Sequence, residues 1–143
     1  MNILVINGPN LNLLGSREIE VYGQETLEEL MTWLESSPIS TNNSFKFFQS
    51  NHEGDLIDVI QDERHWANGI IINPGAFTHY SYAIRDAISA VDIPCVEVHL
   101  SDIYSREDFR KNSVIAPVCV KQYFGKGKNS YMEGLQYLNE LLI

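Results

Sequence analysis

Residues 69–79 read GIIINPGAFTH, and the first five of them form a short apolar run that ends at an asparagine and a proline. Runs of this kind are typical of strands that are buried on both faces of a sheet. Two comparable runs are NILVING at 2–8 and PCVEVHL at 94–100. FKFFQS at 45–50 and IAPVCVK at 115–121 complete a set of five predicted strands.

Helical patterns separate these runs. Leu27, Leu30, Met31 and Leu34 recur at helical spacing, and Pro38 closes that helix. Two capping-box patterns, Ser50 to Glu53 and Ser105 to Asp108, each predict a helix start, and Thr78 is expected to cap a helix that runs to about residue 90. The last helix carries one apolar stripe, made of Tyr131, Leu135, Leu138 and Leu142.

Strand and helix alternate along the whole chain, without a linker, a repeat or a low-complexity segment. This pattern predicts an α/β fold: one domain over residues 1–143, a flavodoxin-like three-layer sandwich with a five-stranded parallel sheet of order 2-1-3-4-5. In such folds the ligand lies outside the carboxyl ends of the strands. The functional residues are therefore expected where the predicted strands end.

The composition limits the classes of partner. A net charge of −9 argues against nucleic acid as a partner, although a local positive pocket can still hold a small anion. No apolar run approaches the ~20 residues that span a bilayer, so no membrane partner is expected. Because a strand is predicted from residue 2, no signal peptide is expected. Cys95 and Cys119 lie in apolar strand runs without a Cys-x-x-Cys spacing, which favours buried free thiols and a cytoplasmic location.

Glu97 and His99 lie two residues apart at a predicted strand end, so their side chains share one face of the sheet. The carboxylate could orient the imidazole and keep it protonated, as a general acid requires. A purely structural histidine pair inside the domain is the alternative. The polar groups at the other strand ends include Asn7 to Asn10 and the segment Asn73 to His79.

Three further side chains allow two interpretations. His79, in the first turn of a helix capped by Thr78, is either a neutral hydrogen-bond partner in a site or an exposed polar residue. Arg106 and Arg110 are spaced to share a helix face, which either pairs with neighbouring acids in solvent or faces the site. The residues expected on the surface are His52, His65, Arg85 and, taken alone, Asp86.

The common cofactor motifs are missing. The chain has no P-loop and no GxGxxG, and NGPN at 7–10 is too generic to indicate phosphate binding. No metal-ligand spacing links the four histidines. The long connection LLGSREIEVYGQET at 13–26 nevertheless holds an arginine and a tyrosine between two glycines, and because it follows the first predicted strand it is expected to lie over the ligand site.

Three segments together resemble the type II 3-dehydroquinate dehydratases: NGPNLNLLGSRE with VYG, NPGAFTHYSYAIRDAI, and EVHLSDIYSREDFR. The resemblance covers nearly the whole chain in the family's order and spacing. It implies a flavodoxin-like fold and a homododecamer built as a tetramer of trimers. It also implies reversible anti elimination of water from 3-dehydroquinate through an enolate to give 3-dehydroshikimate, in the shikimate pathway or in quinate catabolism, with no cofactor, metal, nucleotide or Schiff base.

The resemblance also implies catalytic roles. Tyr22 would remove the C2 proton, and Arg17, on a lid over residues 15–24 with Gly15 and Gly23 as hinges, would favour the tyrosinate. Asn10 would hold a water that stabilises the enolate. His99, oriented by Glu97, would protonate the departing C1 hydroxyl. Because tyrosine is almost entirely protonated at pH 7, such a base needs cations nearby.

The remaining implied roles concern binding. Asn73, Ser101 and backbone amides near Leu100 would bind the substrate carboxylate, and His79 and Arg110 would hold ring hydroxyls. Arg106 would add positive field near the base, and Asp86 would reach a neighbouring subunit's site.

Two features depart from the family pattern. Tyr80 replaces a small polar residue, and YFGKGKNSYMEG at 123–134 is unusually polar, which bears on subunit packing. Two other functions remain open for this fold. A phospho-receiver domain would suit Lys121 but needs an aspartate where Asn73 stands. A flavin-binding electron carrier is the other alternative.

Overall fold

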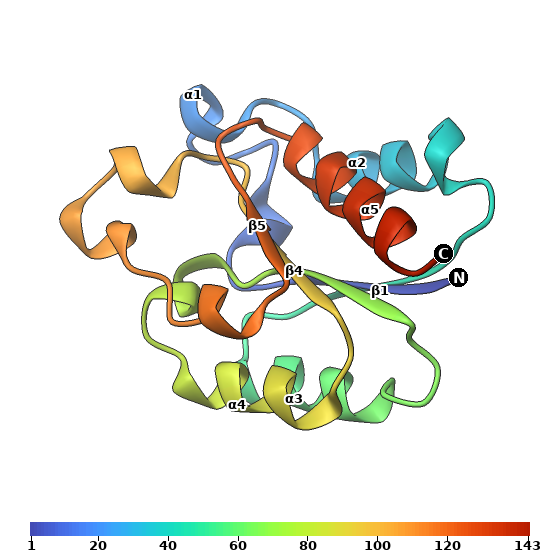
Figure 1. The fold of residues 1–143 in the computed structure, drawn as a ribbon. Helices are drawn as coiled ribbons and strands as arrows, with labels where there is room; N and C mark the ends of the chain where they lie inside the picture. The colour runs from blue at the N-terminus through green and yellow to red at the C-terminus, as the bar shows by residue number, and fades with distance from the viewer.

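The computed structural model describes all residues from 1 to 143, and its centre is one parallel five-stranded sheet. The strand order is β2-β1-β3-β4-β5, which confirms the predicted topology (Figure 1). The strands are β1 (Asn2–Asn7), β2 (Ser44–Gln49), β3 (Gly69–Asn73), β4 (Cys95–Val98) and β5 (Lys121–Tyr123).

Helices cover both faces of this sheet. The long helices are α2 (Leu27–Glu35), α3 (Glu53–Asp62), α4 (Tyr82–Val91) and α5 (Asn129–Leu141). Figure 1 shows α2 and α5 on one side and α3 and α4 on the other. Alternate residues of each central strand supply the two cores: Ile3 and Val5 pack in the α2 and α5 layer, and Leu4 and Ile6 pack in the α3 and α4 layer.

Short elements fill the connections at the carboxyl edge of the sheet and elsewhere. One turn of α-helix, α1 (Ile19–Tyr22), lies within the predicted lid. Six 3₁₀ helices are η1 (Leu11–Leu13), η2 (Pro38–Ser40), η3 (Gly75–His79), η4 (Ile103–Ser105), η5 (Asp108–Lys111) and η6 (Ala116–Val118).

The predicted fifth strand at 115–121 is wrong in its position. The middle of that segment, Ala116–Val118, forms η6, which contains Pro117 in its first turn, and pairing to β4 begins only where the Val120 amide donates to the Cys95 carbonyl at 2.8 Å. Proline has no N–H to offer a sheet, so the strand starts after it. Both cysteines are free, but only Cys95 lies in a strand and is buried, whereas Cys119 is half-buried after η6.

Three predicted helix caps are also wrong. Ser81, not Thr78, caps α4 by accepting from the Ile84 amide at 3.0 Å, because 75–79 forms a 3₁₀ helix first. Ser50 donates to Asp55 at 2.8 Å, and α3 begins after it. Ser105 ends η4 and donates to a carbonyl of its own turn, so no single helix carries the arginines at 106 and 110.

The sheet reverses its strand order between β1 and β3, and their ends meet closely there. The Gly8 amide donates to the Asn73 carbonyl at 2.8 Å, and a Cβ at Gly8 would lie 2.5 Å from the Pro74 carbonyl oxygen. Only glycine permits this approach. The close contact brings the loops after β1 and β3 to one edge, where a ligand site is expected in this class of fold.

None of the helices has the length and apolar character needed to cross a membrane.

Candidate functional site

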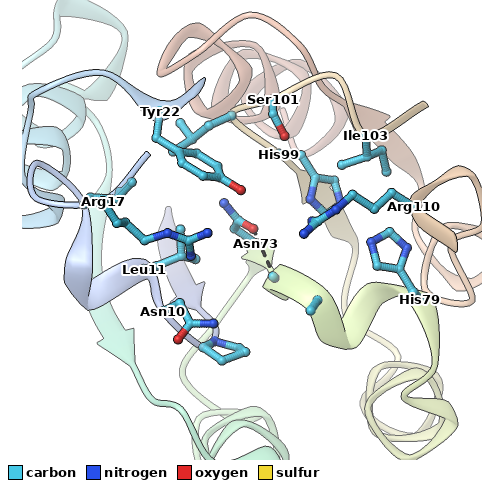
Figure 2. Close-up of a pocket in the computed structure, with 15 residues that line it drawn as sticks. Asn10, Leu11, Arg17, Tyr22, Asn73, His79, His99, Ser101, Ile103 and Arg110 are labelled. Atoms are coloured by element: carbon cyan, nitrogen blue, oxygen red, sulfur yellow. Dashed lines mark hydrogen bonds between the residues drawn. The ribbon is translucent and has the colours of Figure 1, made fainter. Parts of the chain in front are cut away.

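A pocket lies at the carboxyl edge of the sheet, where the loops after β1, β3 and β4 converge (Figure 2). Nine of the predicted site residues line it: Asn10, Arg17, Tyr22, Asn73, His79, His99, Leu100, Ser101 and Arg110. Six lining residues carry no functional prediction from the sequence: Pro9, Leu11, Leu14, Gly75, Ala76 and Ile103. They are small or apolar and shape the pocket walls.

Glu97 and His99 form the sheet side of the pocket. Both are buried, and the His99 Nε2–H donates to Glu97 Oε2 at 2.5 Å, which confirms that they share one face of the sheet. Because Nε2 is occupied by the carboxylate, Nδ1 is the ring nitrogen available to a ligand. The pair therefore fits both interpretations: it is a structural pair inside the domain, because an internal carboxylate holds His99, and it belongs to the site, because His99 lines the pocket.

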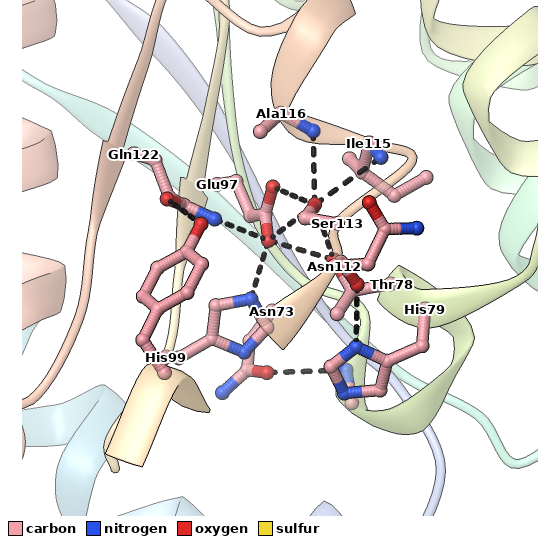
Figure 3. A network of polar contacts seen from close by, with 12 residues as sticks. Asn73, Thr78, His79, Glu97, His99, Asn112, Ser113, Ile115, Ala116 and Gln122 are labelled. Carbon is pink, nitrogen blue, oxygen red and sulfur yellow. Dashed lines mark hydrogen bonds and ion pairs between the residues drawn. The ribbon is translucent and has the colours of Figure 1, made fainter. Parts of the chain in front are cut away.

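The environment of Glu97 favours its ionised form. Burial tends to raise the pKa of this carboxyl, but hydrogen bonds from His99, Thr78 and Gln122 outweigh burial and hold the pKa below its ordinary value. Thr78 and Gln122 lie 19 and 25 positions from Glu97, and Ser113 also donates to it (Figure 3). No spacing rule in the sequence links these residues, so sequence reasoning did not find them.

The lid side of the pocket carries the tyrosine and two arginines. Arg106 donates to the Tyr22 hydroxyl at 2.7 Å, and the Arg17 guanidinium carbon lies 4.9 Å from the Tyr22 ring centroid. Glu18 pairs with both arginines, and its hydrogen bond with Arg17 is the main reason why its pKa is lowered. Tyr22 thus sits in a cluster of positive charge, partly balanced by one carboxylate.

The lid ends at two glycines with positive φ, Gly15 at 90° and Gly23 at 81°. A Cβ at Gly15 would lie 2.9 Å from the Gln24 carbonyl oxygen, so the two ends of the lid meet closely. Their role as hinges stays a prediction.

Arg106 and Arg110 point to different places because Arg106 directly follows η4 and Arg110 lies within η5. Arg106 lies behind Tyr22 and does not line the pocket. Arg110 does line it, while its side chain pairs with Glu107.

The sequence predicted His79 in the first turn of a helix, which is wrong, because His79 is the last residue of η3. Its Nδ1 donates to the Asn112 carbonyl at 2.7 Å, which leaves Nε2 as the free nitrogen. Burial lowers the pKa of His79, and the charges of His99 and Arg110 lower it further. The expected neutral imidazole is confirmed in direction, but burial and neighbouring charge cause it, not a helix terminus.

Asn73 is held in one orientation by groups on two elements, η3 and α5. The Gly75 amide donates to its Oδ1 at 3.2 Å, and its Nδ2 donates to the Tyr131 hydroxyl at 3.0 Å. That hydroxyl donates in turn to Asn7 Oδ1 at 2.6 Å. One Nδ2 hydrogen of Asn73 remains for a ligand. Tyr131 appeared in the sequence only as a core residue.

Two backbone amides beside this asparagine have no acceptor in the chain. The N–H groups of Leu100 and Ser101 follow β4 and donate to no carbonyl or side chain. With the Ser101 hydroxyl and the free hydrogen of Asn73, they offer a cluster of donors suited to an anionic group.

The remaining predicted residues lie elsewhere or at the rim. Asn10, at a φ of 70°, lines the pocket from the loop after β1. Asp86 is exposed on α4 and is absent from the pocket of its own chain. His52 and His65 are exposed, as predicted.

Comparison with known proteins finds one family whose members match nearly the whole chain. A family model described as dehydroquinase class II matches residues 1–139. The 3-dehydroquinate dehydratases of Caldicellulosiruptor saccharolyticus and Bacillus subtilis are 57% and 52% identical, over 98% and 96% of this chain and 97% and 93% of theirs. The crystal structure of the type II dehydroquinase from Butyrivibrio crossotus superposes with a TM-score of 0.94 at 50% identity, covering 97% of each chain.

These matches decide between the functions that the fold alone leaves open. Neither a phospho-receiver domain nor a flavin carrier accounts for them, and the end of β3 carries the amide Asn73 where a receiver needs a carboxylate. The sheet order, the placement of the site residues and the similarity across residues 1–139 agree, and the chain belongs to the class II dehydroquinase family.

Proposed function

We propose that this protein is a hydro-lyase that dehydrates 3-dehydroquinate to 3-dehydroshikimate in the shikimate pathway. Its family membership supports this activity, as do relatives named for the same reaction. The observation that carries the proposal is a single pocket in which a tyrosine beside two arginines and a histidine paired with a buried carboxylate both line the wall. Such a pair supplies the base and the acid that an elimination requires.

Tyr22 is the base in this proposal. Its hydroxyl accepts a hydrogen bond from Arg106, and Arg17 lies against its ring, so both cations stabilise the phenolate. The phenolate takes the proton from C2, next to the substrate ketone. The electron pair moves onto the ketone oxygen and forms an enolate. A water held by Asn10, which lines the same pocket, would donate to that oxygen.

His99 completes the elimination. It transfers its Nδ1 proton to the C1 hydroxyl as the C1–O bond breaks, and the hydroxyl leaves as water. The enolate electrons return to form the double bond of the product. Tyr22 then holds one extra proton and His99 lacks one, so the enzyme is restored by proton exchange with solvent. The ionised Glu97 supports this role because it stabilises the imidazolium form.

The donor cluster after β4 is suited to the substrate carboxylate. Asn73, the Leu100 and Ser101 amides and the Ser101 hydroxyl would bind it. The free Nε2 of the neutral His79 would accept from a ring hydroxyl, and the Arg110 guanidinium would donate to another. These contacts would present C2 to the lid and C1 to the sheet.

We also propose a homododecamer arranged as a tetramer of trimers, in which Asp86 reaches a neighbouring site. The exposed position of Asp86 on α4 is compatible with this role. Size-exclusion chromatography with light scattering tests the assembly, and a stable monomer that turns over substrate would contradict it. Two free thiols fit the reducing cytoplasm, which we propose as the location.

A direct assay tests the proposed reaction. Purified protein mixed with 3-dehydroquinate should produce the near-ultraviolet absorbance of a conjugated enone. Borohydride added with substrate should leave the enzyme active, since no Schiff base forms. Absence of any conversion by the folded protein would reject the proposed activity.

A further inference from the structure

Glu97 lies at the centre of a cluster of hydrogen-bond donors behind the pocket (Figure 3). Its Oε2 accepts from His99 Nε2 at 2.5 Å, from Thr78 Oγ1 at 2.6 Å and from Gln122 Nε2 at 3.1 Å. Its Oε1 accepts from Ser113 Oγ at 2.8 Å. The side chain of Glu97 is fully buried, so these groups take the place of water.

The direction of the Ser113 hydrogen bond is fixed by its backbone partners. The amides of Ile115 and Ala116 donate to Ser113 Oγ at 3.2 and 3.0 Å. A hydroxyl oxygen accepts two hydrogen bonds and donates one. With both acceptor positions filled, the single O–H of Ser113 has to donate, and Glu97 Oε1 at 2.8 Å is a closer and charged acceptor than the Thr78 hydroxyl oxygen at 3.0 Å.

The Gln122 amide contacts Tyr104 on one side and Glu97 on the other. The Tyr104 hydroxyl donates to Gln122 Oε1 at 2.7 Å. The opposite orientation would turn the amide oxygen toward the Glu97 carboxylate and place two acceptors together. The Nε2 of Gln122 therefore faces Glu97 as a donor.

A protonated Glu97 would find only one acceptor in this cluster, the Nε2 of a neutral His99. Ser113, Thr78 and Gln122 each direct a hydrogen toward the carboxyl oxygens, and hydrogen bonds of this kind are stronger to a carboxylate than to a carboxylic acid. The cluster therefore selects the carboxylate over the acid. The lowered pKa of Glu97, in spite of burial that acts to raise it, agrees with this selection.

We propose that Ser113, Thr78 and Gln122 are positioning residues that act through Glu97 to keep His99 in its imidazolium form. This inference rests on the proposed dehydration. The proton between the pair can lie on His99 Nε2 beside a carboxylate, or on Glu97 beside a neutral imidazole. Only in the first form does loss of the Nδ1 proton to the leaving hydroxyl leave a neutral imidazole, and the three donors stabilise this form because they favour the carboxylate.

Other titratable or charged groups lie around Glu97 and His99, and the variants described below leave these groups in place. They are Cys95 on β4, His79 on η3, Tyr104 on η4 and Arg110 on η5. None of the four donates to Glu97, so none can replace a deleted donor.

The test uses Ser113→Ala and Gln122→Met in the full-length enzyme. Each should lower kcat about tenfold and change KM less than about twofold, because the donors act on a proton and not on substrate contacts. The acid limb of the kcat/KM pH profile should move up by about one pH unit, since Glu97 is more easily protonated without its donors. Ser113→Thr, made in place of Ser113→Ala, keeps the hydroxyl and should show the kcat and the acid limb of the wild type.

Ser40→Ala is the matched control. It removes another buried serine hydroxyl, which donates to the Leu34 carbonyl far from the pocket. It should leave kcat and the pH profile unchanged. If Ser113→Ala does not fold, Gln122→Met gives the same test from the other side of Glu97.

The outcomes separate this inference from the proposed reaction. An inactive, folded wild type would reject the reaction itself. An active wild type with unchanged kcat and acid limb in the folded variants would overturn the positioning role alone. A rise in KM at constant kcat would also overturn it, because it would indicate a role in binding.

Discussion

Tyr22 lies on α1, a single helical turn in which no residue is buried, whereas His99 directly follows β4, in which all four residues are buried. The lid residue is held by side chains, chiefly Arg106 and Arg17. The sheet residue is held by a carboxylate that has its own internal donors. The proposed base, on an exposed turn, can move with substrate, while the proposed acid, on the sheet, keeps a fixed position.

The largest expected effect comes from the lid. Tyr22→Phe should lower kcat by about a thousandfold, because it removes the only group that takes the C2 proton. The melting temperature should stay close to wild type, because α1 buries no residue. Steady-state kinetics and thermal unfolding measure both. A variant with wild-type kcat would remove Tyr22 as the base.

The matching change on the sheet should differ in its effect on stability. His99→Ala should lower kcat about a hundredfold, and it should also cost about 3 kcal/mol of unfolding free energy. The cost arises because the buried Glu97 loses its partner. Denaturant unfolding of the two variants side by side tests the contrast. Equal stability of His99→Ala and Tyr22→Phe would contradict it.

A smaller effect is expected behind the carboxylate subsite. Tyr131→Phe leaves the side-chain Oδ1 of Asn7 and one Nδ2 hydrogen of Asn73 without their partner. KM should rise about tenfold with kcat little changed, since Asn73 is no longer held in one orientation. Kinetics over a range of 3-dehydroquinate concentrations distinguish this result from a loss of kcat, which would assign Tyr131 a different role.

The smallest expected effect is on the pH dependence of stability, and it should differ between Glu97 and Glu18, two carboxyl groups whose pKa values are both lowered. Burial opposes ionisation of Glu97, but its hydrogen bonds prevail, so its folded pKa lies below the ordinary 4.5. Its contribution to stability is present above pH 4.5 and is lost as pH falls through the folded value. Glu97→Gln should therefore flatten the acid loss of stability.

Glu18 is the control for that experiment. Its pKa is lowered by the Arg17 hydrogen bond, but it is exposed on the lid. Glu18→Gln should leave the pH dependence of the melting temperature unchanged. A flattening as large as that of Glu97→Gln would mean that the lid is tied into the fold more strongly than its exposure indicates.

The sheet and the main site residues could be predicted from local pattern. Apolar runs of strand length that alternate with helical patterns predicted the parallel sheet and its strand order. The rule that ligands bind at the carboxyl ends of the strands placed His99, Asn73 and Asn10 at one edge. The resemblance added Tyr22 and Arg17, whose positions in a loop carry no periodic signal.

The 3₁₀ segments and the supporting residues could not be predicted in this way. Thr78 reads as a helix cap, but its hydroxyl is taken by Glu97, and Ser81 caps α4 instead. Tyr131 is 124 positions from Asn7, and Ser113 is 16 positions from Glu97. These partners are chosen by tertiary packing, which local spacing does not encode.

Solvent exchange at C2 of 3-dehydroquinate tests the division between lid base and sheet acid most directly. In deuterated water, His99→Ala should exchange the C2 proton, because Tyr22 still forms the enolate, while little product appears. Tyr22→Phe should show no exchange above the rate of substrate alone. Exchange by Tyr22→Phe at the rate of His99→Ala would contradict the assignment of the base to the lid.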